Sequence, residues 1–393
     1  MAALAVRRIS ILLWFASLCP ALVVSAAAQL PLNSADIAKI TPAFDAPAPN
    51  SLKCYVEKWK PFLDFALRFQ TGYLLHCRLG LFEGKKVTVI TYLRITPEGK
   101  SPTLLGSGFS LPEITPDMRA GTNPMNLKQE IEMSGIFSVG TGDYSVEVLV
   151  LDDRGRSCRR HWKIRVAPTR SQRRVHLVMP PLTVQPLDRK AWKAPPSQRG
   201  GGIRLTVLLD AAPVNPYQSH LRAWDRTFLL ECIYSLLRQL PYKSVRLVAF
   251  NLDQQREIFR REPFDDAAFL DLSRALREIE TATVSVRALK NRNSPEFLTN
   301  LANQELTAVD PSDAVILLGP NSRIDANTRP ELLTRKPGSP PFFYFEYIPW
   351  AGSAFPDSIQ DLTKALDGKT FQIHSPAELD QAIQKMLTQL KQE

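Results

Sequence analysis

Asp210 is the residue whose type and position come closest to supporting chemistry in this chain. It ends the apolar strand within RLTVLLDAAPVNP (204–216), and a carboxylate after a buried strand can begin a divalent-cation site. The next residues, Ala211 to Val214, carry no oxygen-bearing side chain. Because one carboxylate cannot hold a hard cation tightly, we predict no metal and no cofactor. Asp210 is then expected to accept hydrogen bonds from its own turn.

The residue patterns of common enzymes are missing from the sequence. There is no Gly-x-Ser-x-Gly elbow, no His-Glu-x-x-His motif and no phosphate-binding loop. His220 and His374 have no nucleophile beside them, and Asp265 and Asp266 are adjacent, so on a helix they would point in different directions. The sequence predicts a non-catalytic protein, with a hydrolase of unrecognised site as an alternative.

The first 28 residues predict an export signal. Arg7 and Arg8 precede an apolar run over 9–24, and the small residues 26–28 precede Gln29, where cleavage is expected. The run is shorter than the roughly 20 apolar residues of a membrane span. We therefore expect a periplasmic or secreted protein that is not an integral membrane protein.

Four cysteines remain after the export signal, and none forms a Cys-x-x-Cys pair. This spacing gives no support for zinc binding, whereas an oxidising compartment favours a disulfide. Cys54 is expected on the first strand of its block and Cys158 at the start of the last, so we predict this pair, with Cys54 and Cys77 as the alternative. Cys232 falls within a helical apolar pattern and is expected to be a buried thiol.

Composition divides the chain into five parts and gives it a formal net charge of +10. The basic linker could make weak contact with anionic surfaces, while nucleic acid is not expected as a partner of an exported protein. The predicted parts are the export signal (1–28), a flexible Pro/Ala-rich segment (29–51), a β-sandwich domain (52–167), a basic Pro-rich linker (168–202) and an α/β domain (203–393).

The block 52–167 shows the period-two alternation of half-buried strands. Apolar residues alternate over 63–69, 87–95 and 144–150, and turn residues separate these stretches. Short strands without a convincing helix predict a β-sandwich. The segment GDYSVEVLVLDDRGR resembles the penultimate strand and hairpin of immunoglobulin-like bacterial modules, with Tyr144 placed like a corner tyrosine.

From residue 203 onward, apolar strands alternate with helices, which predicts a doubly wound, mostly parallel, Rossmann-like sheet covered on both faces. The first helix is predicted because Trp224, Phe228, Cys232 and Leu236 recur every four residues. Strands are predicted over 204–210, 244–250, 283–289, 314–320, 342–348 and 369–374, and helices over 221–240, 265–280, 294–309, 357–366 and from 376 to the end.

Residues 203–393 resemble the von Willebrand factor A domain. The resemblance rests on the strand ending in Asp210, the ribbon near Ile258, the strand AVILLGP and the closing pattern GKTFQIHSPAELDQAIQKML. The whole layout is similar to secreted two-domain A-domain-related proteins of acidobacteria-like bacteria. The family's Asp-x-Ser-x-Ser motif is degenerate here, because Ala212 and Val214 replace the serines and Gly319 with Pro320 replaces the second aspartate. The resemblance therefore implies a metal-independent domain.

In open α/β sheets, ligands bind beyond the carboxyl ends of the strands. We expect this edge to bind another envelope or extracellular protein, in an adhesion or scaffold role; the alternative is a carbohydrate or small-molecule receptor with Tyr217, Tyr347 and Trp350 as stacking platforms. Another interpretation is that Tyr347 and Trp350 simply pack beneath a loop. The candidate binding residues are Asp210, Asn215, Tyr217, Asn321, Arg323, Tyr347 and Trp350.

Overall fold

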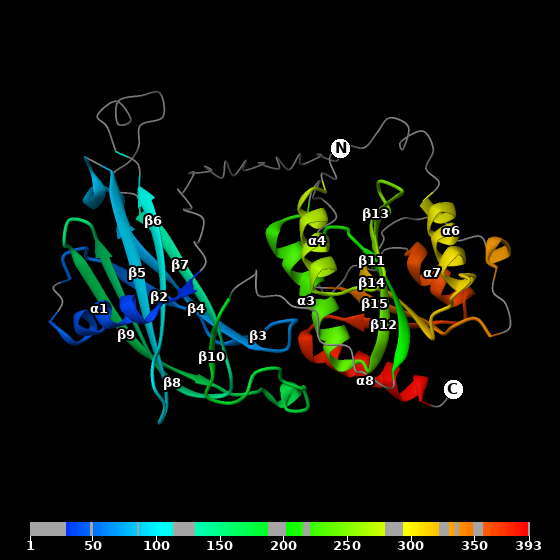
Figure 1. The fold of residues 1–393 in the computed structure, drawn as a ribbon, viewed down its shortest axis with the longest axis horizontal. Coiled ribbons are helices and arrows are strands. Elements are labelled where there is room, and N and C mark those ends of the chain that lie inside the picture. The colour runs from blue at the N-terminus through cyan, green and yellow to red at the C-terminus, as the bar shows by residue number, and fades with distance from the viewer. Residues whose placement is uncertain are drawn as a thin grey trace, which may run out of the picture.

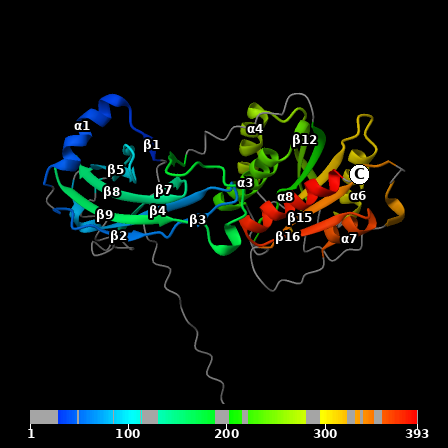
Figure 2. The same ribbon diagram turned by 90° about the horizontal axis from the view of Figure 1, so that it is seen from below.

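The computed structural model (Figure 1) contains an N-terminal unit of antiparallel strands and a C-terminal unit of strands and helices, which contact each other. Figure 2 shows the same two units from below. The described residues are 29–47, 50–84, 86–111, 113, 130–187, 202–214, 221–279, 294–321, 330–334, 338–348 and 357–391. Within them, no helix combines the length and the apolarity that crossing a membrane requires.

Two antiparallel sheets that share one core make up the N-terminal unit. Their strand orders are β1-β6-β5-β8-β9 and β10-β7-β4-β2, and β3 pairs with β4. The predicted antiparallel character of this block is therefore confirmed. The strands are β1 (Leu30–Pro31), β2 (Tyr55–Lys58), β3 (Phe62–Leu63), β4 (Phe69–Arg78), β5 (Val87–Pro97), β6 (Thr103–Leu111), β7 (Glu130–Val139), β8 (Gly142–Asp152), β9 (Ser157–Val166) and β10 (Val184–Pro186). A 3-10 helix, η1 (Leu79–Phe82), follows β4.

The core between these sheets follows from the alternation of apolar residues along each strand. In β5, Val87, Val89, Leu93 and Ile95 are fully buried, because every second side chain faces the same side of a sheet. A disulfide joins Cys54 to Cys158 within this core, with their Cα atoms 6.0 Å apart. This confirms the predicted pair over the Cys54–Cys77 alternative. Cys77 and Cys232 are free and buried.

A helix, α1 (Ser34–Asp45), covers the outer face of the first sheet, although the composition of 29–51 does not predict it. Asn33 caps the helix, since its side-chain oxygen accepts a hydrogen bond of 2.8 Å from the Asp36 amide. Ile40 and Phe44 are buried in a small apolar cluster with side chains from β6 and β8. The helix is thus held by packing against the N-terminal unit.

The first part of the predicted linker belongs to the N-terminal unit. Residues 168–187 contain η2 (Arg170–Gln172) and β10, which pairs with β7 as an added strand. Tyr144 donates from its hydroxyl to the Gly140 carbonyl at 2.9 Å and lies 3.2 Å from the Thr183 carbonyl. The Val178 amide donates to the Leu67 carbonyl at 2.9 Å. Residues 188–201 lie outside the described part of the chain.

A six-stranded mixed sheet forms the centre of the C-terminal unit, in the order β13-β12-β11-β14-β15-β16. All neighbouring pairs are parallel except β12 with β13, which confirms the predicted, mostly parallel sheet. The strands are β11 (Ile203–Asp210), β12 (Tyr242–Asn251), β13 (Arg256–Arg261), β14 (Ala314–Pro320), β15 (Phe342–Tyr347) and β16 (Lys369–Ile373). The helices are α3 (Ala223–Gln239), α4 (Asp266–Arg277), α6 (Ser294–Leu306), α7 (Ser358–Ala365), α8 (Pro376–Leu390) and the 3-10 helix η4 (Pro330–Leu332).

Helices lie on both faces of this sheet. The helices α3, α4 and α8 share one apolar cluster with the sheet, and α6 and α7 share another with its opposite face. Every residue of β14 is buried, because a central parallel strand is covered from both sides and needs a continuous apolar run. The strand predicted over 283–289 lies outside the described residues.

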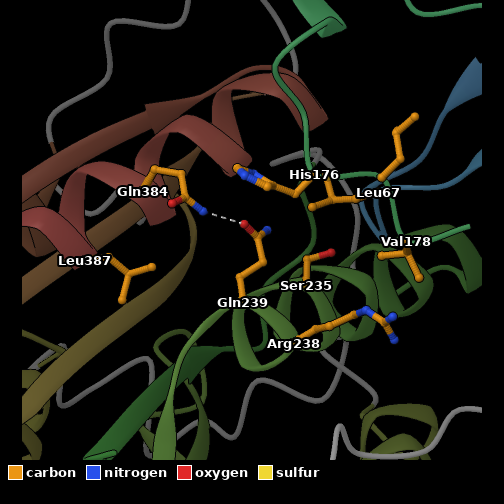
Figure 3. A pocket seen from close by; sticks show the side chains of 9 residues that line it. Leu67, His176, Val178, Ser235, Arg238, Gln239, Gln384 and Leu387 are labelled. Carbon is orange, nitrogen blue, oxygen red and sulfur yellow. Dashed lines mark hydrogen bonds between the residues drawn. The ribbon is translucent and has the colours of Figure 1, made fainter.

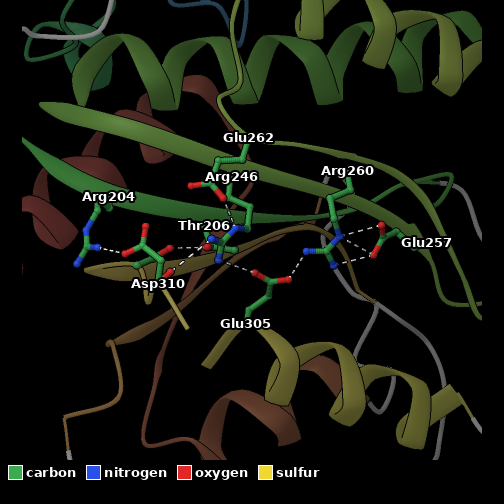
Figure 4. Close-up of polar contacts among 9 residues, drawn as sticks. Arg204, Thr206, Arg246, Glu257, Arg260, Glu262, Glu305 and Asp310 are labelled. Carbon is green, nitrogen blue, oxygen red and sulfur yellow. Dashed lines mark hydrogen bonds and ion pairs between the residues drawn. The ribbon is translucent and has the colours of Figure 1, made fainter. Parts of the chain in front are cut away.

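Buried ion pairs join α6 to the strands beneath it (Figure 4). Glu305 of α6 is 1% exposed, and its carboxylate accepts from Arg246 of β12 at 3.3 Å and from Arg260 of β13 at 2.6 Å. The two arginines also bind the more exposed Glu262 and Glu257. A buried carboxylate is tolerated only when it is paired and hydrogen-bonded, so this network fixes α6 against the edge of the sheet.

The hairpin turn between β3 and β4 belongs to the N-terminal unit and packs against the C-terminal unit. We call residues 64–68 the docking turn. Ala66, at 1% exposure, belongs to the apolar cluster of α3 and the mixed sheet, and Ser235 of α3 donates to the Phe65 carbonyl. Arg68 forms an ion pair of 3.7 Å with the buried Glu231. The strand predicted over 63–69 is therefore wrong at its centre, because the chain reverses there.

The docking turn is held by the side chain at its start. Asp64 accepts a hydrogen bond of 3.0 Å from the Arg68 amide and one of 2.7 Å from the Arg68 guanidinium. Leu67 adopts a left-handed backbone conformation, with φ of 57°, which bulky residues rarely take without support. Burial raises the pKa of Asp64, and the adjacent Arg68 opposes this shift. These contacts fix the shape of the turn that packs against α3.

Candidate functional site

The five parallel strands of the mixed sheet end on one side, which we call the carboxyl edge. It is defined by the last residues of these strands: Asp210, Asn251, Pro320, Tyr347 and Ile373. Of the predicted binding residues, Asp210, Asn321 and Tyr347 lie there, on or just after the neighbouring strands β11, β14 and β15. The other four, Asn215, Tyr217, Arg323 and Trp350, fall outside the described residues.

Asp210 is completely buried at the carboxyl edge. Within the described chain, neither of its carboxylate oxygens has a hydrogen-bond partner at ordinary geometry, so it does not cap its own turn as expected. Burial, together with the charges of Asp253 and Asp357, raises its pKa well above the usual range of an aspartate; the Leu252 amide only partly opposes this. Because the carboxyl group is completely buried, it cannot contact a partner directly.

The close approach of β14 to β11 helps to enclose Asp210. A Cβ atom at Gly319 would lie 2.7 Å from the Cβ of Asp210, so any larger residue at this position would collide with the aspartate. The backbone beyond Asp210 is also fixed, since the Ala211 amide donates to the Phe250 carbonyl at 2.7 Å. The Asn251 side chain donates to the Ala211 carbonyl at 2.8 Å. The absence of a side chain at Gly319 is therefore a packing requirement of this edge.

Asn321 is held by buried acceptors beneath the carboxyl edge. Its amide nitrogen donates to the Glu346 carboxylate at 3.2 Å, and the same carboxylate accepts from Gln360 at 2.7 Å. The hydroxyl of Tyr344 lies 3.1 Å from the Pro320 carbonyl and 3.1 Å from the Asp357 carboxylate. Asn321 is 8% exposed and Glu346 is 1% exposed. Most of the polar groups behind this edge thus satisfy one another.

Tyr347 is buried by a side chain from the other unit. Its ring stacks on Phe228 of α3 at a centroid distance of 3.6 Å and meets Phe65 of the docking turn edge-on at 5.2 Å. Tyr347 is 6% exposed, and burial raises its pKa. The structure thus places this predicted contact residue against the N-terminal unit.

Trp224 is the aromatic side chain that remains exposed at the carboxyl edge among the described residues. It is 43% exposed and packs edge-on against Phe228, with ring centroids 6.2 Å apart. Phe228, Cys232 and Leu236, which follow it at a spacing of four residues, are buried, whereas Trp224 lies in the first turn of α3 and is partly exposed. Asp225 fixes that turn by accepting from the Val214 amide at 3.2 Å and the Arg222 amide at 2.9 Å.

A second polar cluster lies on the N-terminal unit, around His76 of β4. Its ring is 7% exposed, stacks on Tyr55 at 4.3 Å and places Nδ1 3.3 Å from the Glu130 carboxylate and 3.9 Å from that of Glu132. Both glutamates belong to β7, which pairs with β4, so they lie beside His76 through strand pairing although they are far from it in the sequence. Within the described ranges, no three His, Cys, Asp or Glu side chains are placed to hold a metal ion.

Neither a protein-family model nor a curated protein matches this sequence. Among solved structures, a lipoprotein from Bacteroides thetaiotaomicron is 11% identical with a TM-score of 0.18, and the match covers 34% of this chain and 94% of that one. A calcium-binding mutant of β-glucuronidase 2 from Bacteroides uniformis is 11% identical with a TM-score of 0.19, over 80% of this chain and 38% of that one. Scores this low do not indicate a shared fold.

Proposed function

We propose that this is an exported, non-catalytic protein that binds another envelope or extracellular protein through the carboxyl edge of its C-terminal unit, in an adhesion or scaffold role. The observation that carries this proposal is the exposure of Trp224. Its ring packs against Phe228, which in turn stacks on Tyr347, and both of these rings are buried. Tryptophan anchors with rigid surroundings are enriched among the residues that dominate binding energy at protein interfaces.

The C-terminal unit is proposed to be a metal-independent von Willebrand factor A-like domain, and the N-terminal unit an immunoglobulin-like sandwich. A parallel sheet with one antiparallel strand, β13, at its edge supports the first assignment. The presence of Ala212 and Val214 at the positions of the family's serine ligands supports metal independence. The hydrogen bond from the Tyr144 hydroxyl to the Gly140 carbonyl, four residues upstream, supports the second, since corner tyrosines bond the backbone in this way.

Export is supported by the disulfide between Cys54 and Cys158. Such bonds persist in oxidising compartments and are rare in the reducing cytosol. The disulfide joins the start of the N-terminal unit to its last long strand, β9, so it constrains most of that unit. The export signal predicted over 1–28 lies outside the described residues.

Site-specific photocrosslinking tests the proposed binding face. A photoreactive phenylalanine analogue is placed at Trp224 and, as a matched control, at Leu270 of α4, which is 46% exposed and also apolar. In intact cells, position 224 should give one discrete adduct that position 270 does not. Trp224→Ala should then weaken binding of the purified adduct partner by roughly 30-fold, the size expected for a dominant interface residue. Equal adducts at both positions would contradict the proposal.

Two other outcomes would change the functional class. Retention on a polysaccharide column that is lost in Trp224→Ala would favour a carbohydrate receptor, because sugars stack on exposed aromatic rings. Turnover of a general esterase or glycosidase substrate by the purified protein would favour a hydrolase. Neither outcome is expected if the carboxyl edge binds a protein.

A further inference from the structure

A cavity of about 400 Å³ lies where the two units and their connecting segment meet (Figure 3). Its apolar wall includes Leu67 of the docking turn, Val178 of the connecting segment and Leu387 of α8. Its polar side includes residues of α3. A volume of this size falls within the range of small-molecule sites, which occur preferentially at domain interfaces.

One of the side chains that line the cavity carries a buried hydrogen-bond donor without a partner among the described residues. Gln239, at the end of α3, accepts a hydrogen bond of 2.9 Å from Gln384 of α8 through its amide oxygen, and Figure 3 shows the two side chains pointing toward each other. The amide nitrogen of Gln239 is buried and, within the described residues, has no hydrogen-bond partner. Leaving such a donor unpaired is unfavourable, so an acceptor brought by a ligand would be stabilised there.

The charges around the cavity favour an anionic acceptor. Arg238, beside Gln239, is exposed and contacts the Tyr234 hydroxyl at 3.2 Å, but it forms no ion pair with any described carboxylate. The other ionisable side chain that lines the cavity, His176, already has a partner, since its Nδ1 lies 3.1 Å from the buried Asp380 carboxylate. An unpaired guanidinium next to an unused amide donor is a suitable arrangement for a carboxylate.

We propose that this cavity binds a small amphipathic carboxylate. Its apolar body would lie against Leu67, Val178 and Leu387, and its carboxylate would accept hydrogen bonds from the Gln239 amide and from Arg238. This site goes beyond the proposed partner-binding function. Trp224 and Gln239 are separated by 15 residues of α3, or about 22 Å along the helix axis. Because both units line the cavity, the ligand would also stabilise their docked arrangement.

Octanoate and its neutral analogue 1-octanol are the probes for this site. With the full chain, octanoate should raise the thermal midpoint in a saturable way and give a calorimetric binding isotherm, whereas octanol should bind at least tenfold more weakly. Arg238→Met and Gln239→Glu should each weaken octanoate binding at least tenfold, because they remove the cation or replace the donor with a carboxylate. Arg274→Met, at an exposed arginine on α4, should leave binding unchanged.

A variant that fills the cavity tests the site without changing a charge and without disturbing the Gln239–Gln384 hydrogen bond between α3 and α8. Val178→Phe places a larger apolar side chain in the cavity and should abolish octanoate binding while the protein retains its unfolding transition. The proposal is overturned if octanoate has no effect, if octanol binds as tightly, or if binding persists in both Arg238→Met and Val178→Phe.

Discussion

The docking turn contains one aromatic side chain that faces the C-terminal unit and one, just before it, that does not. Phe65 meets Phe228 edge-on at 4.8 Å and Tyr347 edge-on at 5.2 Å. Phe62, three residues earlier on β3, is 46% exposed. Replacing a fully buried phenylalanine with alanine costs about 3–5 kcal/mol. Because Phe65 is only partly buried, we expect Phe65→Ala to cost about 2–3 kcal/mol.

This loss should fall on the contact between the units, since Phe65 packs on the C-terminal unit while the strands flanking it remain paired in the sandwich. A change of about 2–3 kcal/mol shifts the docking equilibrium roughly 30- to 140-fold toward separated units. In calorimetry, Phe65→Ala should unfold in two resolved transitions where the parent protein shows one. Small-angle scattering should report a larger radius of gyration.

Phe62→Ala is the matched control, because it removes the same side chain from the same hairpin at an exposed position. It should leave both the number of transitions and the scattering curve unchanged. The reasoning is refuted if Phe65→Ala behaves like the parent protein, or if Phe62→Ala separates the units to the same extent.

Two further predictions concern Asp210 and the disulfide. The raised pKa of Asp210 means that the folded state holds a proton that the unfolded state has lost between the ordinary aspartate pKa and the folded one, so stability falls as pH rises through this window. Asp210→Asn, which has no proton to lose, should therefore gain stability relative to the parent protein as pH rises above the ordinary aspartate pKa, and denaturant melts showing a constant difference would contradict this. The disulfide spans a sequence separation of 104 residues, which corresponds to about 4.7 kcal/mol of loop entropy. The Cys54→Ala, Cys158→Ala double variant should lose stability on that scale, whereas equal denaturation midpoints would show that the loop constraint is unimportant.

Local pattern predicts much of this architecture because many elements satisfy local and global requirements together. The run AVILLGP is apolar throughout, and β14 is buried along its whole length. The alternation over 87–95 matches the buried residues of β5. Cys54 and Cys158 were paired from their places near opposite ends of one block, and the sheet pairing brings them together. For the two strands the side-chain pattern determines which residues are buried, whereas the cysteine positions also allowed the Cys54–Cys77 pairing.

The docking turn shows where local pattern fails. Leu63, Phe65, Leu67 and Phe69 alternate like a strand, yet the chain reverses between Leu63 and Phe69. No glycine marks the left-handed position, which Leu67 occupies. The side chains are apolar because they pack on different partners, on the sandwich core for Leu63 and Phe69 and on the C-terminal unit for Phe65. Alternation reports burial, but it does not say which core buries each residue.

Sequence pattern also does not show which unit covers a candidate binding residue at the carboxyl edge. For Tyr347 the sequence leaves open a place at the binding edge or packing beneath a loop, and in the structure Phe65 of the docking turn covers it. A continuous row of ring contacts then runs from Phe65 through Tyr347 and Phe228 to the exposed Trp224. If the carboxyl edge binds a partner, the N-terminal unit supports the base on which its exposed anchor stands. Docking of the two units would therefore be a condition for binding and not only for stability.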